Sequence, residues 1–390
     1  MKRFFETALT AILLAGILIA WTQPAWPSYL FQGAIFALAV AWLACSRGIR
    51  MPVLLWAVAL IPAWPLAQLA LGATEYRWET WNALLYWATG AVVFFLALQV
   101  YAEPRASGRF LRTLVVFGCA MSVVATLQVA MQETRVFWLF STGEPVYGPF
   151  VYHNQYAAFI ELVLPIALAG ALLGRRRISI DGIAAGILFA SVIASYSRAG
   201  SALACLEVAA AIVCCMAVAK TGFRRTLPVL GIIGLAILIF TVAAGWENLG
   251  KRFQQRDPYA ARREMFQSSV EMIRARPWTG FGLGTWPTVY PAYARFDDGL
   301  FINQAHNDWV QWAAEGGIPF ALLILGVVVW AVRPALRSIW AIGLISMAAH
   351  AWVDYPFRKI GLMALWFALL GVLASVAKQD PEKEKMPEKC

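Results

Sequence analysis

The chain has 390 residues, of which 61% are hydrophobic and only 14% are charged. A soluble domain would carry roughly a quarter charged residues, so this composition excludes an ordinary soluble protein and predicts a polytopic helical membrane protein. The net charge of +10 does not indicate nucleic-acid binding, because the Lys and Arg residues are scattered between apolar runs instead of gathered on one soluble domain. We expect no nucleic-acid partner.

Apolar runs of similar length follow one another along the whole chain. Each is close to the roughly 20 residues that a helix needs to cross about 30 Å of hydrocarbon, so we predict an all-α membrane protein with about 12 transmembrane helices. The first run, which follows Lys2 and Arg3, is interpreted as a signal anchor. The predicted spans are 6–22, 28–45, 51–72, 80–101, 109–131, 154–173, 178–196, 199–219, 226–245, 307–331, 336–352 and 360–378.

The distribution of basic residues predicts the orientation in the membrane. With the N-terminus inside, the cytoplasmic segments hold 19 Lys and Arg residues and the short outside loops hold five. The positive-inside rule therefore places both termini in the cytoplasm and the loop 246–305, before the tenth helix, on the outer side. No cysteine falls in an outside loop, so no disulfide framework is expected.

The predicted domain organisation is simple. Residues 1–378 form a single transmembrane domain, which includes the outside loop 246–305, and residues 379–390 form a charged, disordered cytoplasmic tail. Within the loop, 259–276 has helical spacing and ends at Pro277. Its predicted apolar stripe consists of Met265, Phe266, Val270 and Ile273. We expect this loop to lie on the membrane surface.

The glycines at 280, 282 and 284 form a GxGxG pattern in the same loop. The pattern lacks the strand-then-helix setting of a dinucleotide site. A tight turn that allows close backbone approach is the better interpretation.

Arg198 lies in the short outside turn SYSRAGS between the seventh and eighth predicted spans. Two roles fit equally well. The side chain could extend to lipid phosphates at the interface, or its guanidinium could clamp the phosphate of a substrate in a bidentate manner.

His306 opens the tenth predicted span, beside a loop that carries eight Lys or Arg residues. An imidazole can accept a proton near neutral pH, and Asn307 or Asp308 could orient it. A base beside a cationic loop indicates chemistry on an anionic, lipid-linked substrate, although a solvated structural histidine is the simpler alternative. Glu315 is interpreted as a structural hydrogen-bonding residue.

Further polar residues gather on the same predicted face. His350 and Asp354 are four residues apart, which would place them on one helical face next to Arg358; we favour a structural role for this pair. His153 and Asn154 open the sixth span.

Two carboxylates, Glu161 and Glu207, fall within spans, where interhelical bonding is as good an explanation as substrate contact. The first two outside loops offer only Glu75 and Glu79 and no Asp-rich motif, so we expect chemistry without a metal or other cofactor.

Five segments in order resemble the O-antigen ligase and O-antigen polymerase superfamily, over roughly residues 145–375. They are FVYHNQYAAFIELVLPIALA at 150–169, SYSRAGS at 195–201, RREMFQSSVEMIRARPWTGFGLGTW at 262–286, AHNDWVQWAAEGGIPF at 305–320 and AHAWVDYPFR at 349–358.

The resemblance implies a GT-C-like membrane fold and transfer of a glycan from undecaprenyl diphosphate to an acceptor hydroxyl, such as that of lipid A–core, outside the bacterial inner membrane. It also implies that no nucleotide sugar or metal is used. By resemblance, Arg198 and Arg262 would bind the donor diphosphate and His306 would activate the acceptor. Arg263 is adjacent, so which arginine faces the site stays open. Phe266 stands where the family often has Trp.

Several alternatives remain. A polymerase of the same superfamily and transfer to a different acceptor, including a protein, fit the same motifs. A transporter or lipid flippase would more often show two related halves and functional charges near the bilayer midplane. An inactive scaffold is the remaining alternative. Membrane lipids are expected partners in every case.

Overall fold

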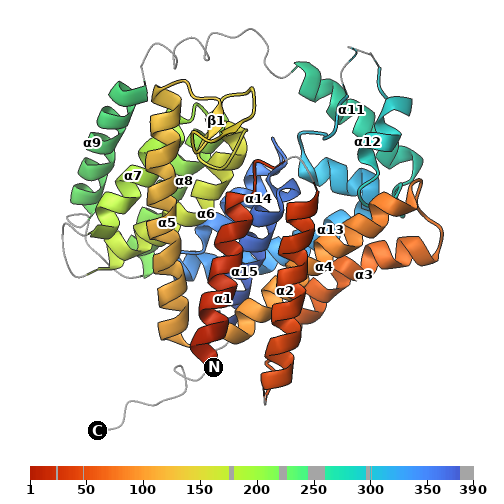
Figure 1. Ribbon diagram of the computed structural model, residues 1–390, viewed down its shortest axis with the longest axis horizontal. Coiled ribbons are helices and arrows are strands. Elements are labelled where there is room, and N and C mark those ends of the chain that lie inside the picture. Colours follow the sequence, from red (N-terminus) through yellow and green to blue (C-terminus); the bar gives the residue numbers. More distant parts are fainter. Residues whose placement is uncertain are drawn as a thin grey trace.

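The computed structural model describes residues 1–22, 25–46, 48–174, 180–218, 226–244, 260–295, 299 and 301–377. Almost all of the described secondary structure is helical, which confirms the prediction of an all-α polytopic membrane protein (Figure 1). The predicted tail 379–390 and the first part of the predicted loop, up to residue 259, lie outside the described residues.

Each predicted span contains a helix. The helices are α1 (Lys2–Leu18), α2 (Trp26–Cys45), α3 (Val53–Ala70), α4 (Arg77–Val100), α5 (Pro104–Ala130), α6 (His153–Leu173), α7 (Ile180–Ala194), α8 (Arg198–Val218), α9 (Thr226–Ala244), α13 (Asp308–Ser338), α14 (Ile342–His350) and α15 (Ile360–Ala377). Among the described residues, eight helices are long and apolar enough to cross a membrane.

The extent of the eleventh predicted span, 336–352, is wrong. Helix α14 has nine residues, and at about 1.5 Å per residue it is too short to cross roughly 30 Å of hydrocarbon. Part of the predicted span belongs to α13, which continues to Ser338 with Pro334 inside it.

The buried centre of the bundle is formed by α6 and α15, which are enclosed along most of their length. Helix α15 packs against α4 and α1, while α6 packs against α7, α8 and α14 (Figure 1). By contrast, α2 and α3 leave many apolar side chains exposed, as expected for helices that face lipid. A short antiparallel hairpin of β1 (Arg135–Val136) and β2 (Phe140–Ser141) lies between α5 and α6.

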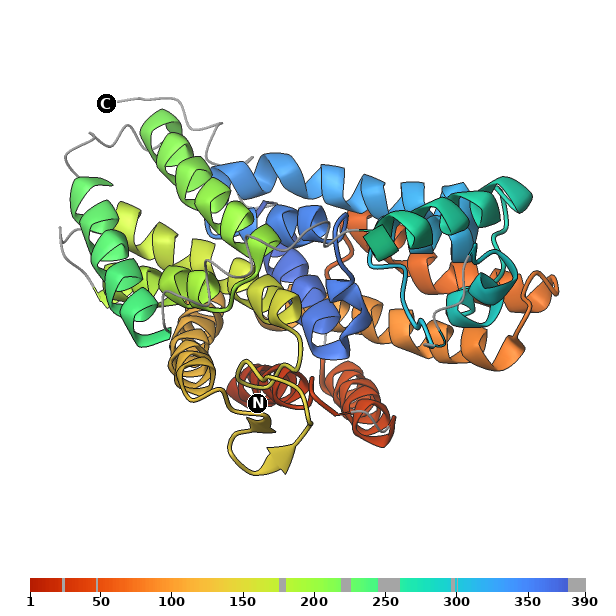
Figure 2. The ribbon, with the colours of Figure 1, turned by 90° about the horizontal axis from the view of Figure 1, so that it is seen from above.

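The helix predicted in the loop is confirmed as α11 (Ala260–Ala275). It is followed by α12 (Trp286–Val289) and the short helix η2 (Tyr290–Ala292), and it lies alongside α13 (Figure 2). The predicted apolar stripe is partly wrong. Met265 is buried and Ile273 packs against the same cluster, but Phe266 is 43% exposed, and Met272, which was outside the predicted stripe, is buried there.

The glycine pattern makes a tight turn with close backbone approach, as predicted. Gly280, Gly282 and Gly284 all have positive φ. A Cβ at Gly280 would lie 2.3 Å from the Glu315 carbonyl oxygen, and one at Gly282 would lie 2.2 Å from Thr74 Oγ1. Only glycine tolerates both constraints.

This glycine turn docks on a break in α13. Gly317 has φ 75° and ψ 169°, so the helical hydrogen bonding is interrupted there. The freed carbonyl of Glu315 accepts hydrogen bonds from Gly282 N (2.9 Å) and from Gln68 Nε2 (2.9 Å). The first turns of α13, directly after His306, are therefore fixed from two sides.

Candidate functional site

Five chain segments that are distant in sequence meet at one end of the bundle. They are the N-terminal ends of α6, α8, α11 and α13, and the turn that follows α14. This end carries the hairpin and α11, on the side of the molecule opposite the N-terminus of α1 (Figure 1). Most of the residues that the sequence analysis selected are on these segments.

Asp354 is the central side chain of this end. Its Oδ2 accepts a hydrogen bond from Asn154 Nδ2 and lies 3.4 Å from Arg262 Nη2. Its Oδ1 lies 3.6 Å from His306 Nδ1. Asp354 lies in the turn after α14, which ends at His350, and the His350 side chain pairs with Glu161 instead of with Asp354. The predicted i,i+4 pair is therefore wrong, and Asp354 instead joins three site segments.

Nearby charges control the ionisation of Asp354. Burial alone would raise the pKa of this carboxyl, but the His306 imidazole and the Arg262 guanidinium lower it more, so the pKa lies below its ordinary value. Asp354 is consequently a carboxylate throughout the neutral range.

This lowered pKa predicts how stability depends on pH. The stabilisation from the Asp354 charge is fully present above the unfolded-state pKa of about 3.9 and is lost as the pH falls through the lower folded-state value. We expect the wild type to melt at a higher temperature than Asp354→Asn, in detergent, at about pH 5, and this advantage to shrink below about pH 4. An advantage already lost at about pH 5 would contradict a lowered carboxyl pKa.

Arg262 is fixed by three acceptors. Besides its contact with Asp354, Nη1 donates to the Val353 carbonyl (2.8 Å) and Nη2 donates to the Tyr152 hydroxyl (2.7 Å). Its neighbour Arg263 is exposed and lines the same cavity, described below. Arg262 and Arg263 therefore both line the cavity, and Arg262 is held by Val353, Tyr152 and Asp354.

His306 is held in an unusual backbone conformation. Its φ of 51° is in the left-handed region, which costs of order 1–3 kcal/mol for a residue other than glycine. The preceding Ala305 N donates to Gln311 Oε1 (3.0 Å), and the ring packs edge-on against Tyr355 (4.8 Å between centroids). The imidazole is 24% exposed and borders the cavity.

Sequence reasoning missed two tyrosines, Tyr152 and Tyr355. Their rings stack on each other (6.0 Å, 12°) beside His306. Burial raises the pKa of both phenols, so both stay protonated. Tyr152 lies in VYHN and Tyr355 in VDYPFR, two segments that carried the family resemblance. Their place in these segments was the one sequence signal that could have identified them.

Asn307 and Asp308 do not orient the imidazole. The Asn307 side chain accepts from Val310 N (3.1 Å) and caps α13. Asp308 accepts from Phe357 N (3.0 Å) and lies 3.6 Å from Arg358 Nε. The carboxylate beside His306 is Asp354, which reaches it from another segment.

Arg358 and Glu315 form a supporting network below the site. Arg358 Nη2 lies 2.9 Å from Glu315 Oε2, while Glu315 Oε1 accepts from Gln311 Nε2 (3.0 Å) and Trp286 N (3.2 Å). This confirms Glu315 as a structural hydrogen-bonding residue and places Arg358 with it. Through Gln311 the same network holds the backbone at Ala305.

The SYSRAGS turn is tied directly to α6. Ser197 Oγ donates to Asn154 Oδ1 (2.7 Å), the residue that also contacts Asp354. A Cβ at Gly200 would lie 2.4 Å from Ala157 Cβ, so glycine permits the close approach of α8 to α6. Arg198 is thereby placed at the first position of α8, and His153 packs against Tyr152 (4.8 Å).

A cavity of about 370 Å³ opens at this end of the molecule. It is lined by Arg262, Arg263, Phe266, Gln267, Ala305, His306, Asn307, Trp352 and Val353. Cationic and titratable side chains thus share one small space with two exposed aromatic residues.

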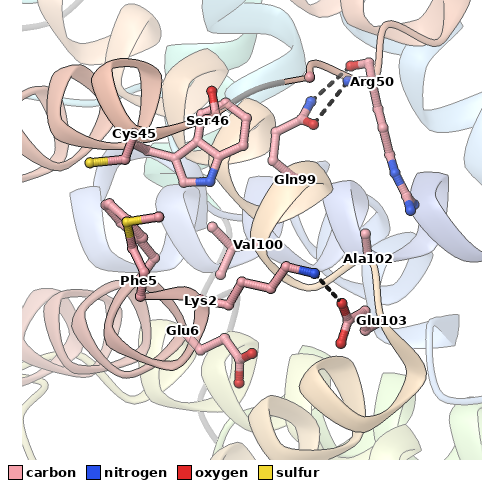
Figure 3. Close-up of a pocket in the computed structure, with 13 residues that line it drawn as sticks. Lys2, Phe5, Glu6, Cys45, Ser46, Arg50, Gln99, Val100, Ala102 and Glu103 are labelled. Carbon is pink, nitrogen blue, oxygen red and sulfur yellow. Dashed lines mark hydrogen bonds and ion pairs between the residues drawn. The ribbon is translucent and has the colours of Figure 1, made fainter.

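A second cavity, of about 340 Å³, lies at the N-terminal end of α1 (Figure 3). There Lys2 Nζ lies 2.6 Å from Glu103 Oε1, and the Gln99 side chain binds the backbone of Arg50 in both directions. None of the predicted site residues lines this cavity, so it is separate from the candidate site.

Residues 183–325 match a protein-family model described as O-antigen ligase. A comparison with curated proteins finds no match. The matched segment runs from α7 into α13 and includes Arg198, Arg262, Arg263 and His306. The family implies a glycosyltransferase-like ligase or polymerase activity, with a lipid-linked glycan donor and a glycan acceptor in general terms. Over these residues the chain is similar to the O-antigen ligase family, which agrees with the resemblance to the O-antigen ligase and O-antigen polymerase superfamily.

Proposed function

We propose that the protein is an O-antigen ligase-type glycosyltransferase of the bacterial inner membrane. It would move a glycan from undecaprenyl diphosphate to a hydroxyl of lipid A–core or a similar acceptor, on the periplasmic side. The observation that carries this proposal is that Arg262 and His306 line one cavity and both contact Asp354, although the three residues come from segments far apart in the chain.

The proposed reaction needs a base at the acceptor and positive charge at the leaving group. His306 would take the proton of the acceptor hydroxyl, with Asp354 beside Nδ1 to orient the ring and stabilise its charged form. The acceptor oxygen then forms the new bond to the anomeric carbon as the bond to the diphosphate oxygen breaks.

The departing undecaprenyl diphosphate gains negative charge in this step. Arg262, whose guanidinium is fixed by Tyr152 and the Val353 carbonyl, would stabilise that charge together with Arg198 and Arg263. Attack from the face opposite the diphosphate predicts inversion at the anomeric carbon. The site residues supply the base and the cations themselves, so we propose a reaction without a metal.

The test uses the full chain in nanodiscs with an undecaprenyl-diphosphate oligosaccharide, with and without lipid A–core. We expect glycan on lipid A–core, unchanged by EDTA, and a loss of about 10²- to 10³-fold in rate in Arg262→Gln, the size of effect seen when one charge-stabilising donor is removed. Glu271→Gln, which removes an exposed surface ion pair on α11, is the matched control and should keep full activity.

The other outcomes separate the alternatives. Longer lipid-linked chains, formed without lipid A–core, would identify a polymerase. If glycan is transferred neither to lipid A–core nor to another lipid-linked glycan, and the lipid-linked glycan moves across vesicle membranes, the proposed glycosyltransferase activity is contradicted and a flippase is supported.

A further inference from the structure

Trp352 is an exposed aromatic side chain in the wall of the candidate cavity. It lies in the turn after α14 and is 55% exposed. Its ring stacks on that of Trp309 at a centroid distance of 5.6 Å and an interplanar angle of 19°. Trp309 is buried, and its Nε1 donates to the Ala348 carbonyl (2.8 Å). One face of Trp352 is therefore held in a fixed orientation by a rigid partner.

The rest of the cavity combines apolar and polar groups. On α11, Phe266 is 43% exposed and stands next to Gln267, while Arg262, Arg263 and His306 supply charge and hydrogen-bonding capacity. A ligand that fits needs a flat apolar face for the aromatic rings and polar groups at its edge. A pyranose ring has both, because its C–H groups lie on its faces and its hydroxyls lie around its edge.

Membrane lipid is the competing explanation for an exposed tryptophan. Tryptophan is enriched at membrane interfaces, and Trp278, which is 70% exposed and does not line the cavity, fits that role. Trp352 differs because it shares its cavity with two arginines and a histidine, which an acyl chain would leave unsolvated.

We propose that Trp352, supported by Trp309, is the stacking platform for a pyranose ring of the glycan that enters this cavity. The inference rests on the proposed function for the presence of a glycan there, and it adds the residue that binds the sugar. The ring belongs either to the acceptor or to the donor, and the experiment separates these two sources.

The experiment compares Trp352→Ala, Trp352→Phe and the matched control Trp278→Ala in nanodiscs. The transfer rate is measured against acceptor concentration and, separately, against donor concentration. We expect Trp352→Ala to raise one KM about five- to tenfold with little change in kcat, because an aromatic stacking contact has about that effect on binding. Trp352→Phe should restore most of the affinity, and Trp278→Ala should leave both KM values unchanged.

A second measurement needs no turnover. Saturation-transfer NMR with the free acceptor oligosaccharide and the free donor oligosaccharide reports which sugar touches the protein. We expect the signal of one of them to fall in Trp352→Ala while the melting temperature is kept. Unchanged signals together with unchanged KM values would overturn the platform. If the wild type transfers nothing, the proposed function fails, whereas the NMR signal still decides the sugar-binding role.

Discussion

His306→Asn is expected to lower the rate of glycan transfer by about 10²- to 10⁴-fold, the usual contribution of a general base. Asparagine is the sharpest substitution here, because it tolerates the left-handed conformation that His306 adopts and cannot take up the acceptor proton. Backbone strain and loss of the base are thereby separated. The measurement is kcat with saturating lipid-linked donor and acceptor.

The donor affinity and the melting temperature serve as internal controls for this variant. Both should stay near the wild-type values, since the diphosphate contacts are assigned to arginines. Asp354→Asn should lower kcat in the same direction by a smaller factor, because it removes the carboxylate beside the imidazole and keeps the base itself. A His306→Asn enzyme with more than a tenth of the wild-type rate would rule out the imidazole as the base.

The fold was largely predictable because hydropathy is a local signal. Apolar runs located a helix in each expected position, and Pro277 marked the end of α11. The same signal failed at residues 336–352, where Arg333 and Pro334 resemble a helix boundary but lie inside α13. A proline is tolerated there, and no local pattern reveals that α14 is short.

Site residues within short sequence motifs could be predicted. Site residues whose importance comes from a contact with a distant part of the chain could not. Arg198, Arg262 and His306 were selected from short segments, and Arg262 and His306 lie at one cavity. Spacing paired Asp354 with His350, whereas the Asp354 side chain contacts Asn154, Arg262 and His306 on other segments. Tyr152 was missed because its contact with Arg262 joins residues 110 positions apart, which spacing alone cannot show.

The intramembrane carboxylate Glu161 was left between two explanations, and the structure supports interhelical bonding. Glu161 Oε1 lies 2.7 Å from His350 Nδ1, and both side chains are fully buried between α6 and α14. Removing one partner of such a pair leaves the other without compensation, at a cost of about 3–5 kcal/mol. We therefore expect Glu161→Ala and His350→Ala each to lower the free energy of unfolding by about that amount, measured by denaturant unfolding in detergent.

The double variant Glu161→Leu/His350→Phe tests whether this pair is only structural. Replacing a buried pair by apolar side chains is often neutral or stabilising, so the double variant should be more stable than either single variant. The His350 carbonyl accepts from Val353 N (2.9 Å) and Asp354 N (3.1 Å), bonds that the double variant retains. With the turn that carries Asp354 intact, transfer activity should recover along with stability. Recovery of stability without recovery of transfer would contradict the structural assignment, because it would mean that the His350 imidazole or the Glu161 carboxylate contributes to the site itself.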